Sequence, residues 1–370
     1  MTTSTTPQYT VVGAGAIGGT LAAHLHLAGA DVHLVDADPE HVAAIREHGL
    51  RIEQPGDELI ARMPISTPDD APERLGAVLL AVKAQATDGV AAWIAPRLAD
   101  DGWVVSMQNG LNEATIARHI GAERTVAAFV DLFADVIAPG VVKDGGIGDI
   151  ALGEYSGGAS ERVHTLASDL RHWGSPVVSD NVQGFLWSKL GFGSMLVATA
   201  LADDDMGDLI DRHRVGMHAL VREVLTVARA EGIVLEGFDA FLPDEYLGDA
   251  ALGDAGLGDA TGAGDATRAS SAGPRGDAAE AARADAATDG LVAWLARQTK
   301  KRSGIWRDIA VRGRRTEVPT QYGPVLEAAE RHGLPTPLVS WLVDTIVRLE
   351  THEIEMGDDH LVELDRLASA

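Results

Sequence analysis

Apolar and polar positions follow two different patterns in the two halves of the chain. In the first half, short apolar runs alternate with segments of helical spacing, such as Thr20 to about Ala28 and Pro39 to His48. Four of the short runs have the composition of buried strands: residues 9–12, 31–36, 76–82 and 103–107. Strands that alternate with helices up to about residue 178 predict an α/β fold built on a doubly wound parallel sheet.

The second half changes to long helices from about Gly184. Residues 186–201 are apolar nearly all round, which predicts the central buried helix of a second domain. Residues 213–232 and 324–350 also carry helical periodicity. We therefore expect a mostly α-helical C-terminal domain.

Three glycines separate the first predicted strand from the first predicted helix. Gly13 allows a tight turn, Gly15 lets backbone N–H groups approach a pyrophosphate, and Gly18 lets the helix pack closely. The helix N-terminus offers its positive dipole end to the phosphates. The second strand ends in an acid, Asp36, at 18 residues past Gly18, close to the spacing of a ribose-binding acid. This context predicts a dinucleotide-binding Rossmann domain; an ordinary glycine-rich turn is the alternative.

These patterns divide the chain into a disordered start at residues 1–8, a Rossmann domain at 9–180 and a helical substrate and catalytic domain at 181–370. Within the last, residues 247–290 contain three copies of Leu-Gly-Asp-Ala and a run of Ala, Gly and Asp. That composition buries too little apolar surface to offset its ordering entropy. We expect a flexible insertion with a helical end near residues 278–287. The spacing of the aspartates in this segment does not match that of a calcium-binding loop.

Charge and composition exclude several classes of protein. The formal net charge of −25 over 370 residues argues against nucleic acid and anionic membranes as partners. The chain has no cysteine, so disulfides and thiolate metal sites are excluded, and we expect no metal. The start lacks the pattern of a signal peptide, and no uninterrupted apolar run approaches the ~20 residues of a membrane span. We expect a soluble, cytoplasmic protein.

Lysine is rare here, with 5 lysines among 30 basic residues. Lys83 and Lys189 both lie among apolar residues, so each either reaches outward from a core element or is held inward for function. Burial lowers the pKa of an ammonium group, which suits proton donation to a carbonyl. The sequence alone does not decide whether either lysine points outward or is held inward for function.

Two further polar segments are candidates for a site. Lys83 and Asn109 each follow a predicted strand, and ligands of such sheets bind beyond the carboxyl ends of the strands. Asn109 could hold a cofactor or a substrate oxygen, or form a simple Asn-Gly turn with Gly110. The segment 312–317 is rich in arginine, and a solvated charge run is its usual interpretation.

Several motifs together resemble the ketopantoate reductase (2-dehydropantoate 2-reductase) family of the 6-phosphogluconate dehydrogenase-like superfamily. The resemblance covers nearly the whole chain except residues 247–290. The motifs are Gly13-Ala-Gly-Ala-Ile-Gly-Gly19, Val82-Lys83-Ala-Gln, Gln108-Asn109-Gly110, Leu152-Gly-Glu-Tyr, Leu186-Trp-Ser-Lys189-Leu, Arg315-Thr-Glu317 and His332-Gly-Leu-Pro-Thr-Pro337.

The resemblance implies hydride transfer between a nicotinamide cofactor and a 2-oxo acid or 2-hydroxy acid. Lys189 matches the catalytic lysine, Glu317 the acid that supports it, and Asn109 an active-site asparagine. We expect a buried Lys189 ammonium that faces the nicotinamide ring in the cleft between the domains. The residues expected to bind the cofactor are Gly13, Gly15, Ala16, Ile17, Gly18, Asp36, Lys83 and Asn109.

Two departures from the family pattern bear on specificity. Gly193 and Val197 stand where the family usually has substrate-binding asparagines, and Ser303 aligns only loosely with a substrate-binding serine. The pocket should therefore be roomier and less polar. Asp36 stands near the position of an arginine in the mostly NADPH-dependent family. Because a carboxylate accepts bonds from ribose hydroxyls and repels a 2′-phosphate, we expect NAD, with NADP as the alternative.

Two other functions stay open at this stage. The same fold could oxidise a bulkier, less polar hydroxy compound or reduce an imine. A non-catalytic dinucleotide sensor is a second alternative, although Lys189 and Glu317 together argue against it. The expected partner is a small carbonyl or hydroxy compound, and a homodimer formed through the helical domain stays open.

Overall fold

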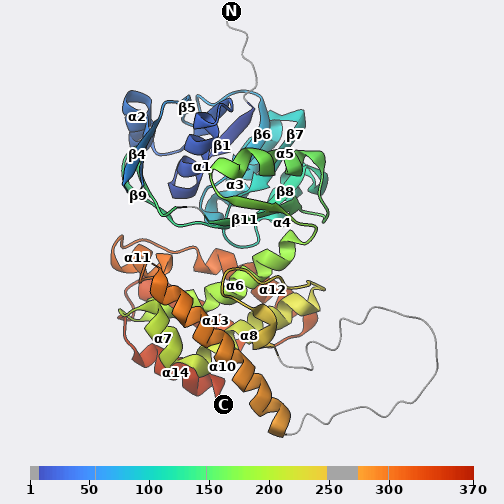
Figure 1. The fold of residues 1–370 in the computed structure, drawn as a ribbon, viewed down its shortest axis with the longest axis vertical. Coiled ribbons are helices and arrows are strands. Elements are labelled where there is room, and N and C mark those ends of the chain that lie inside the picture. The colour runs from blue at the N-terminus through green and yellow to red at the C-terminus, as the bar shows by residue number, and fades with distance from the viewer. Residues whose placement is uncertain (1–7, 55, 147, 248–273, 299) are drawn as a thin grey trace, which may run out of the picture. The chain divides into compact units, whose positions relative to one another are not determined.

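The structure is a computed structural model that describes residues 8–54, 56–146, 148–247, 274–298 and 300–370. It divides into two compact units, one that ends at Leu186 and one that begins at Trp187 (Figure 1). The division lies inside helix α6 (Val182–Ala198). Residues 1–7 of the predicted disordered start lie outside the described residues.

The N-terminal unit is built on an eight-stranded sheet in the order β12-β11-β8-β7-β6-β1-β2-β5. All neighbouring strands are parallel except β8 and β11, which are antiparallel. The mixed α/β architecture predicted from the alternating pattern is confirmed. The strands are β1 (Tyr9–Val12), β2 (Val32–Val35), β5 (Ile65–Ser66), β6 (Leu75–Leu80), β7 (Leu98–Ser106), β8 (Thr125–Asp131), β11 (Asp149–Glu154) and β12 (Ser175–Val178).

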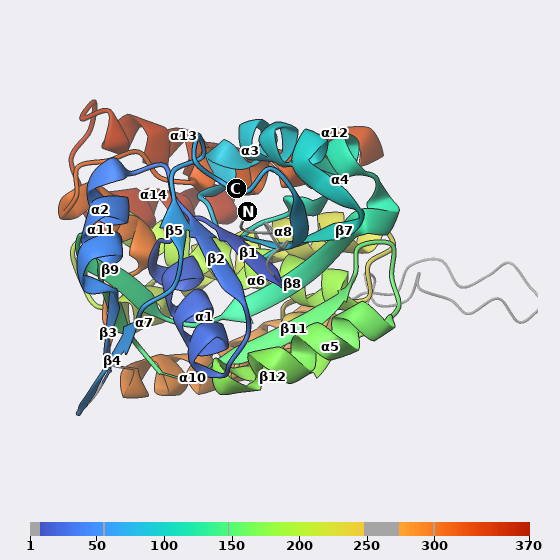
Figure 2. The same cartoon turned by 90° about the horizontal axis from the view of Figure 1, so that it is seen from above.

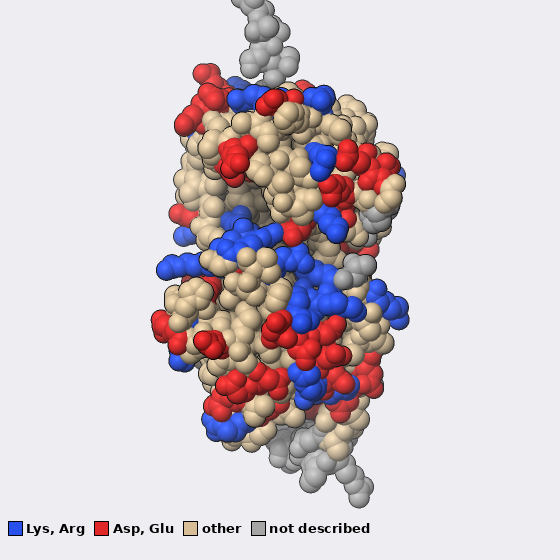
Figure 3. All heavy atoms as spheres, turned by 90° about the vertical axis from the view of Figure 1, so that its left-hand side faces the viewer, with Lys and Arg blue, Asp and Glu red and all other residues tan. Residues whose placement is uncertain are grey.

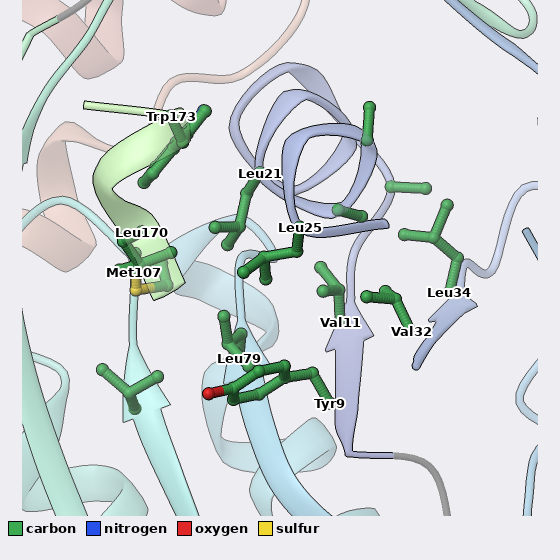
Figure 4. Packing of buried hydrophobic residues seen from close by; sticks show 14 of the residues in the cluster. Tyr9, Val11, Leu21, Leu25, Val32, Leu34, Leu79, Met107, Leu170 and Trp173 are labelled. Atoms are coloured by element: carbon green, nitrogen blue, oxygen red, sulfur yellow. The ribbon is translucent and has the colours of Figure 1, made fainter. Parts of the chain in front are cut away.

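Helices cover both faces of this sheet (Figure 2). The helices are α1 (Ala16–Leu27), α2 (Pro39–His48), α3 (Thr87–Ile94), α4 (Glu113–Ile120) and α5 (Glu161–Asp169), with short 3-10 turns at Ala84–Ala86, Ala95–Arg97, Ala122–Arg124 and Leu170–His172. Side chains of α1 and α5 pack on one face, and those of α3 and α4 on the other. Figure 4 shows Leu21 and Leu25 of α1 against Val11 of β1 and Leu79 of β6, with Met107, which directly follows β7, in the same cluster. Helix α1 therefore lies fixed on the sheet.

A smaller sheet of four strands lies in the same unit, in the order β4-β3-β10-β9. The strands β3 (Leu50–Gln54) and β4 (Asp57–Ala61) form an antiparallel hairpin. Apolar and polar residues alternate along β3, as expected for a hairpin. Strands β9 (Ala134–Ala138) and β10 (Val141–Asp144) complete it. This pairing joins segments that are far apart in the sequence, and local patterns did not predict it.

The C-terminal unit is helical, as predicted. It contains most of α6 together with α7 (Met206–Arg212), α8 (Arg214–Ala230), α10 (Pro274–Arg297), α11 (Gly304–Ala310), α12 (Val318–His332), α13 (Pro337–Glu350) and α14 (Asp359–Ala368), and 3-10 turns at Thr199–Leu201 and Pro243–Tyr246. One described helical segment, Val182–Leu201, is long and apolar enough to cross a membrane by length and composition. Gln183 and Lys189 interrupt its apolar run, and 78% of its apolar window is buried, as in a core helix.

A helix occupies the C-terminal end of the predicted insertion at 247–290, as expected near residues 278–287, but it is longer than predicted and partly buried. Helix α10 begins at Pro274, and Ala284, Ala287 and Thr288 are buried. The helix propensity and composition of this segment do not reveal the tertiary contacts that bury these side chains. The remainder of the predicted insertion, residues 248–273, lies outside the described residues, as do most of the Leu-Gly-Asp-Ala repeats.

A buried polar cluster holds α10 against α8. The Thr288 hydroxyl lies 2.8 Å from Nε2 of His218 and 3.2 Å from the hydroxyl of Tyr246. The rings of His218 and Tyr246 meet edge to face at 5.5 Å. Burial lowers the pKa of His218 from 6.5 to about 4, so the imidazole is neutral at physiological pH.

Acidification should therefore destabilise the C-terminal unit through His218. In the unfolded chain, His218 becomes protonated below about pH 6.5. In the folded chain, it stays neutral down to about pH 4. We expect the free energy of unfolding at pH 5 to be roughly 1–2 kcal/mol lower than at pH 7.5 from this residue alone. Thermal melts of the wild type and of His218→Gln at both pH values measure the difference. An identical loss in both proteins would show that His218 is not the cause.

Candidate active site

The glycine turn between β1 and α1 has the geometry of a phosphate cradle. Gly13 has a φ of +98°, and a Cβ there would lie 2.9 Å from the backbone of Ala81 and Val82. A Cβ at Gly18 would lie 1.9 Å from the carbonyl oxygen of Gly13. At Gly15, in contrast, an added Cβ would meet no heavy atom of the described residues within 4 Å beyond its own chain neighbours and nearby helix backbone. The turn is thus closed on the sheet side and open at Gly15.

The N-terminus of α1 fits the phosphates of a dinucleotide. Helix α1 begins at Ala16, four residues earlier than predicted, because Gly15 takes the N-cap position. No side chain in the described part of the chain makes a capping bond there. Ala16 and Ile17 are half-buried in the first turn. The first backbone N–H groups of a helix have no partner within it, so an anion is a suitable partner.

Asp36 is anchored to this turn. Its Oδ2 accepts a hydrogen bond from the backbone N–H of Ala14 at 2.7 Å, and its Oδ1 accepts one from Asp38 at 2.8 Å. The side chain is half-buried directly after β2. A fixed negative charge therefore lies beside the glycine turn, where the ribose of a bound dinucleotide is expected.

His41 holds the same turn from the other side. The backbone N–H of Gly140 donates to its Nδ1 at 3.0 Å, so Nε2 carries the proton and donates to the carbonyl oxygen of Ala14 at 2.9 Å. The side chain is buried, and Gly140 lies in the turn between β9 and β10. Sequence analysis missed His41, because nothing in the local pattern of α2 marks a partner 99 positions away.

Removing the His41 side chain should weaken cofactor binding. His41→Ala leaves the carbonyl of Ala14 and the N–H of Gly140 without their partners, so the glycine turn loses a fixed contact. We expect KM for the cofactor to rise roughly 10-fold, equivalent to about 1.4 kcal/mol, with kcat within about threefold of wild type. Steady-state kinetics measure this, with exposed His48→Ala of the same helix as the control. Equal effects of the two changes would contradict the role of His41.

The loops that carry Lys83 and Asn109 follow β6 and β7, as predicted. Both side chains are exposed, so Lys83 is not held in the core. Gly110 has a φ of +90°, which confirms an Asn-Gly turn at this position. The turn presents the side chain of Asn109 beyond the carboxyl end of β7.

Buried polar side chains connect these two loops. Gln108 donates from Nε2 to the carbonyl of Val82 and to the Thr87 hydroxyl, both at 2.8 Å. The Thr87 hydroxyl lies 3.3 Å from Oδ1 of Asn112, whose Nδ2 donates to the backbone oxygen of Asn109 at 2.8 Å. Sequence analysis missed these positioning residues; the Gln-Asn-Gly motif was the signal that could have led to Gln108.

Lys189 and Glu317 come from two helices of the C-terminal unit. Lys189 is half-buried on α6, between the buried residues Ser188 and Leu190, and the expected position of its ammonium at the nicotinamide stays a prediction. Glu317 is buried at 8% exposure and takes the N-cap position of α12. The Tyr322 hydroxyl of α12 donates to the carbonyl of Leu190 at 2.9 Å, which joins the two helices beside these residues.

The three predicted substrate residues differ in their surroundings. Gly193 is half-buried and Val197 buried at 3% exposure, both on α6. Ser303 is buried, and its Oγ accepts from the backbone N–H of Trp306 at 3.2 Å as the N-cap of α11. The Ser303 hydroxyl thus has a structural role, and its contact with a substrate stays a prediction.

The arginine-rich segment before Glu317 is more than a solvated charge run. Arg312 and Arg314 both donate to the Oδ1 of Asp308, at 3.1 and 2.8 Å, and Asp308 is buried. This pairing ties the segment to α11. Figure 3 shows lysine and arginine side chains gathered in groups among the acidic ones on one face.

Sequence comparisons place the chain among ketopantoate reductases. The family described as ketopantoate reductase PanE/ApbA matches residues 9–157, and its C-terminal counterpart matches 181–350. A 2-dehydropantoate 2-reductase of Mesorhizobium japonicum is 34% identical over 251 residues, 61% of this chain and 76% of the relative. One from Halobacterium salinarum is 28% identical over 308 residues, 81% of this chain and 84% of the relative.

Solved structures share the fold. A PanE/ApbA family ketopantoate reductase from Ralstonia eutropha is 24% identical with a TM-score of 0.72, covering 94% of this chain and 99% of that one. A D-mandelate dehydrogenase with NADH and anilino(oxo)acetate is 21% identical with a TM-score of 0.70, covering 93% and 99%. The glycine turn and the matched family fit a nicotinamide cofactor. The chain therefore belongs to the ketopantoate reductase family and is an oxidoreductase of that type.

Proposed function

We propose that the protein interconverts a 2-oxo acid and a 2-hydroxy acid, with Lys189 as the proton donor to the carbonyl oxygen. One observation carries this proposal: a lysine is held half-buried on the apolar helix α6, between two buried neighbours. In such a position the aliphatic stem packs along the helix while the ammonium stays accessible to a bound substrate. The domain that precedes it carries the glycine turn suited to a dinucleotide.

The residues divide the chemistry among them. A bound nicotinamide supplies the hydride that adds to the 2-oxo carbon. Lys189 Nζ donates its proton to the carbonyl oxygen as that oxygen gains charge, and is reprotonated from solvent. The Glu317 carboxyl supports the lysine, and the Asn109 amide holds a substrate or cofactor oxygen. Lys83 lines the cofactor side, and the turn at Gly13, Gly15 and Gly18 receives the pyrophosphate.

The surroundings of α6 favour a substrate with a bulkier, less polar side chain. Neither Gly193 nor Val197 offers an amide, so a polar side chain would find no donor from these two positions. A D-mandelate dehydrogenase of the same fold has been solved with NADH and anilino(oxo)acetate, which carries a phenyl ring. We propose aromatic or branched 2-oxo acids as substrates, with 2-dehydropantoate as the competing candidate that the curated relatives suggest.

We also propose a preference for NAD over NADP. The support is the carboxylate of Asp36, which accepts two backbone N–H bonds and is thereby fixed beside the turn. We further propose a metabolic role in the cytoplasm with a small-molecule substrate. The formal charge of −25 argues against nucleic acid or an anionic membrane as the partner.

An absorbance screen tests the proposed function. The full chain is mixed with NADH or NADPH and a panel of 2-oxo acids that includes 2-dehydropantoate and phenylglyoxylate, and loss of the reduced nicotinamide is followed. We expect turnover of at least one 2-oxo acid, faster with NADH. If the cofactor binds, as seen by quenching of protein fluorescence, but no 2-oxo acid is reduced, the alternative of a non-catalytic sensor is supported instead.

A further inference from the structure

Three oxygen atoms are buried around the loop that carries Asn109. They are Oγ of Ser106, Oε1 of Gln108 and Oε1 of Glu113, and none of them has a hydrogen-bond partner within the described residues. The three side chains are 0%, 6% and 1% exposed. Because buried polar atoms in native proteins are nearly always paired, three such oxygens at one loop indicate a functional constraint on it.

All three side chains lie on the face of the sheet that α3 and α4 cover. Ser106 ends β7, and the extended chain continues through Met107, whose N–H donates to β6 at 2.9 Å. The side chains of Ser106 and Gln108 therefore point to the same face, and Gln108 donates to Thr87 of α3. Glu113 is the first residue of α4, which packs on that face as well.

The Glu113 carboxyl faces both ends of this loop. Burial raises the pKa of Glu113 from 4.5 to about 7, while its own N–H, the Ser106 hydroxyl and the backbone N–H of Asn112 act in the opposite direction. Ser106 is the last residue of β7 and Asn112 the N-cap of α4. Asn112 also donates from its side chain to the backbone oxygen of Asn109 at 2.8 Å, so one residue links the carboxyl to the Asn109 turn.

The number of protons decides how the buried oxygens pair. The amide oxygen of Gln108 only accepts, and the Ser106 hydroxyl brings one proton to three oxygens. An ionised Glu113 adds no donor, whereas a protonated Glu113 adds one. A buried carboxylate beside oxygens without donors is disfavoured by desolvation and by repulsion between lone pairs. The protonated carboxyl therefore fits this loop better than the charged one.

Other titratable groups lie on the elements around Glu113. Burial and the Glu113 charge both raise the pKa of Tyr155, which follows β11, so this phenol is neutral near pH 7. On α3, Asp88 pairs with Arg118 and His119 towards the C-terminal end of α4. The neighbouring strands and loops carry further charges that are exposed or half-buried, at Lys83, Asp100, Asp101, Asp131, Asp149 and Glu154.

We propose that Glu113 is a positioning residue, whose protonated carboxyl holds the Asn109 turn in the conformation that receives cofactor and substrate. Loss of the proton places a charge among buried oxygens, and the loop relieves it by moving Asn112 and, with it, the turn. Activity should therefore fall as the pH rises through about 7. The kinetic readout of this inference rests on the proposed function, whereas cofactor binding tests it without turnover.

A pH profile of the wild type and of Glu113→Gln tests the role of the proton. Glutamine has the shape of the protonated carboxyl, keeps a donor and does not ionise. The wild-type kcat/KM for the best 2-oxo acid should fall roughly 10-fold between pH 6 and pH 8.5, with its midpoint near 7. The dissociation constant of NADH, measured by fluorescence titration, should rise over the same range. In Glu113→Gln both steps should disappear.

Two further variants make the test specific. Glu123→Gln removes an exposed carboxylate just after α4 and should keep the wild-type profile. Ser106→Ala removes a hydroxyl that favours the charged form of Glu113, so it should move the step to higher pH, and it serves as the test if Glu113→Gln does not fold.

Each possible result has one meaning. A step near pH 7 that persists in Glu113→Gln, or that keeps its position in Ser106→Ala, overturns the inference. Absence of turnover with every 2-oxo acid overturns the proposed function instead. The pH dependence of NADH binding then still decides the role of Glu113.

Discussion

Replacing Lys189 with alanine should lower kcat by roughly 10²–10⁴-fold, the range expected when a positioned general acid is lost. The Lys189 side chain is half-buried on α6 with buried neighbours on both sides. No other lysine is therefore expected to take over its proton transfer. The glycine turn belongs to the other compact unit. We therefore expect the dissociation constant of NADH to change by less than about twofold. Steady-state kinetics and a fluorescence titration measure the two quantities.

A matched lysine substitution controls for the loss of positive charge. Lys143 lies exposed on β10, and Lys143→Ala removes the same charge with no proposed role in the reaction. Its kcat should stay within twofold of wild type. If Lys189→Ala retains wild-type kcat, another group donates the proton and the assignment fails.

Replacing Asp36 with asparagine should reverse much of the preference for NADH. Asparagine keeps an acceptor oxygen for the backbone N–H of Ala14 but removes the charge. The repulsion of a 2′-phosphate then disappears, while the bonds to the ribose hydroxyls weaken. Hydrogen bonds to charged groups are worth about 1.5–3 kcal/mol, so we expect the ratio of kcat/KM for NADH to that for NADPH to fall roughly 10–100-fold.

Asp38→Asn is the matched control for this change. Asp38 caps α2 through the backbone N–H groups of Glu40 and His41, so its substitution tests the effect of losing a nearby carboxylate and of disturbing the same loop. It should alter the cofactor ratio less than threefold. A wild-type enzyme that uses NADPH as well as NADH would already refute the role given to Asp36.

Local signals predicted those elements that depend on local interactions. The strand Tyr9–Val12 and the helix Pro39–His48 agree with the structure residue for residue. The helix has its N-cap at Asp38, a proline at its first position and Gly49 after its end, all of which are visible in the sequence. Helix α1 begins earlier than predicted because Gly15 of the glycine turn takes its N-cap position.

Features that depend on distant pairing could not be read from the sequence. The antiparallel pairing of β11 with β8 and the second sheet arise from contacts between remote segments. The same applies to His41, Gln108 and Tyr322, whose hydrogen-bond partners lie far along the chain. Helix α10 looked like part of a polar, alanine-rich insertion, but its buried side chains pack in the C-terminal unit.

Transfer of a labelled hydrogen tests the central claim most directly. The wild-type chain is incubated with phenylglyoxylate or 2-dehydropantoate and NADH carrying deuterium at the transferred C4 position, and the product is analysed by mass spectrometry. The account predicts a 2-hydroxy acid with one deuterium bound to C2. A product without deuterium, or no reduced acid at all while the cofactor is bound, would contradict it.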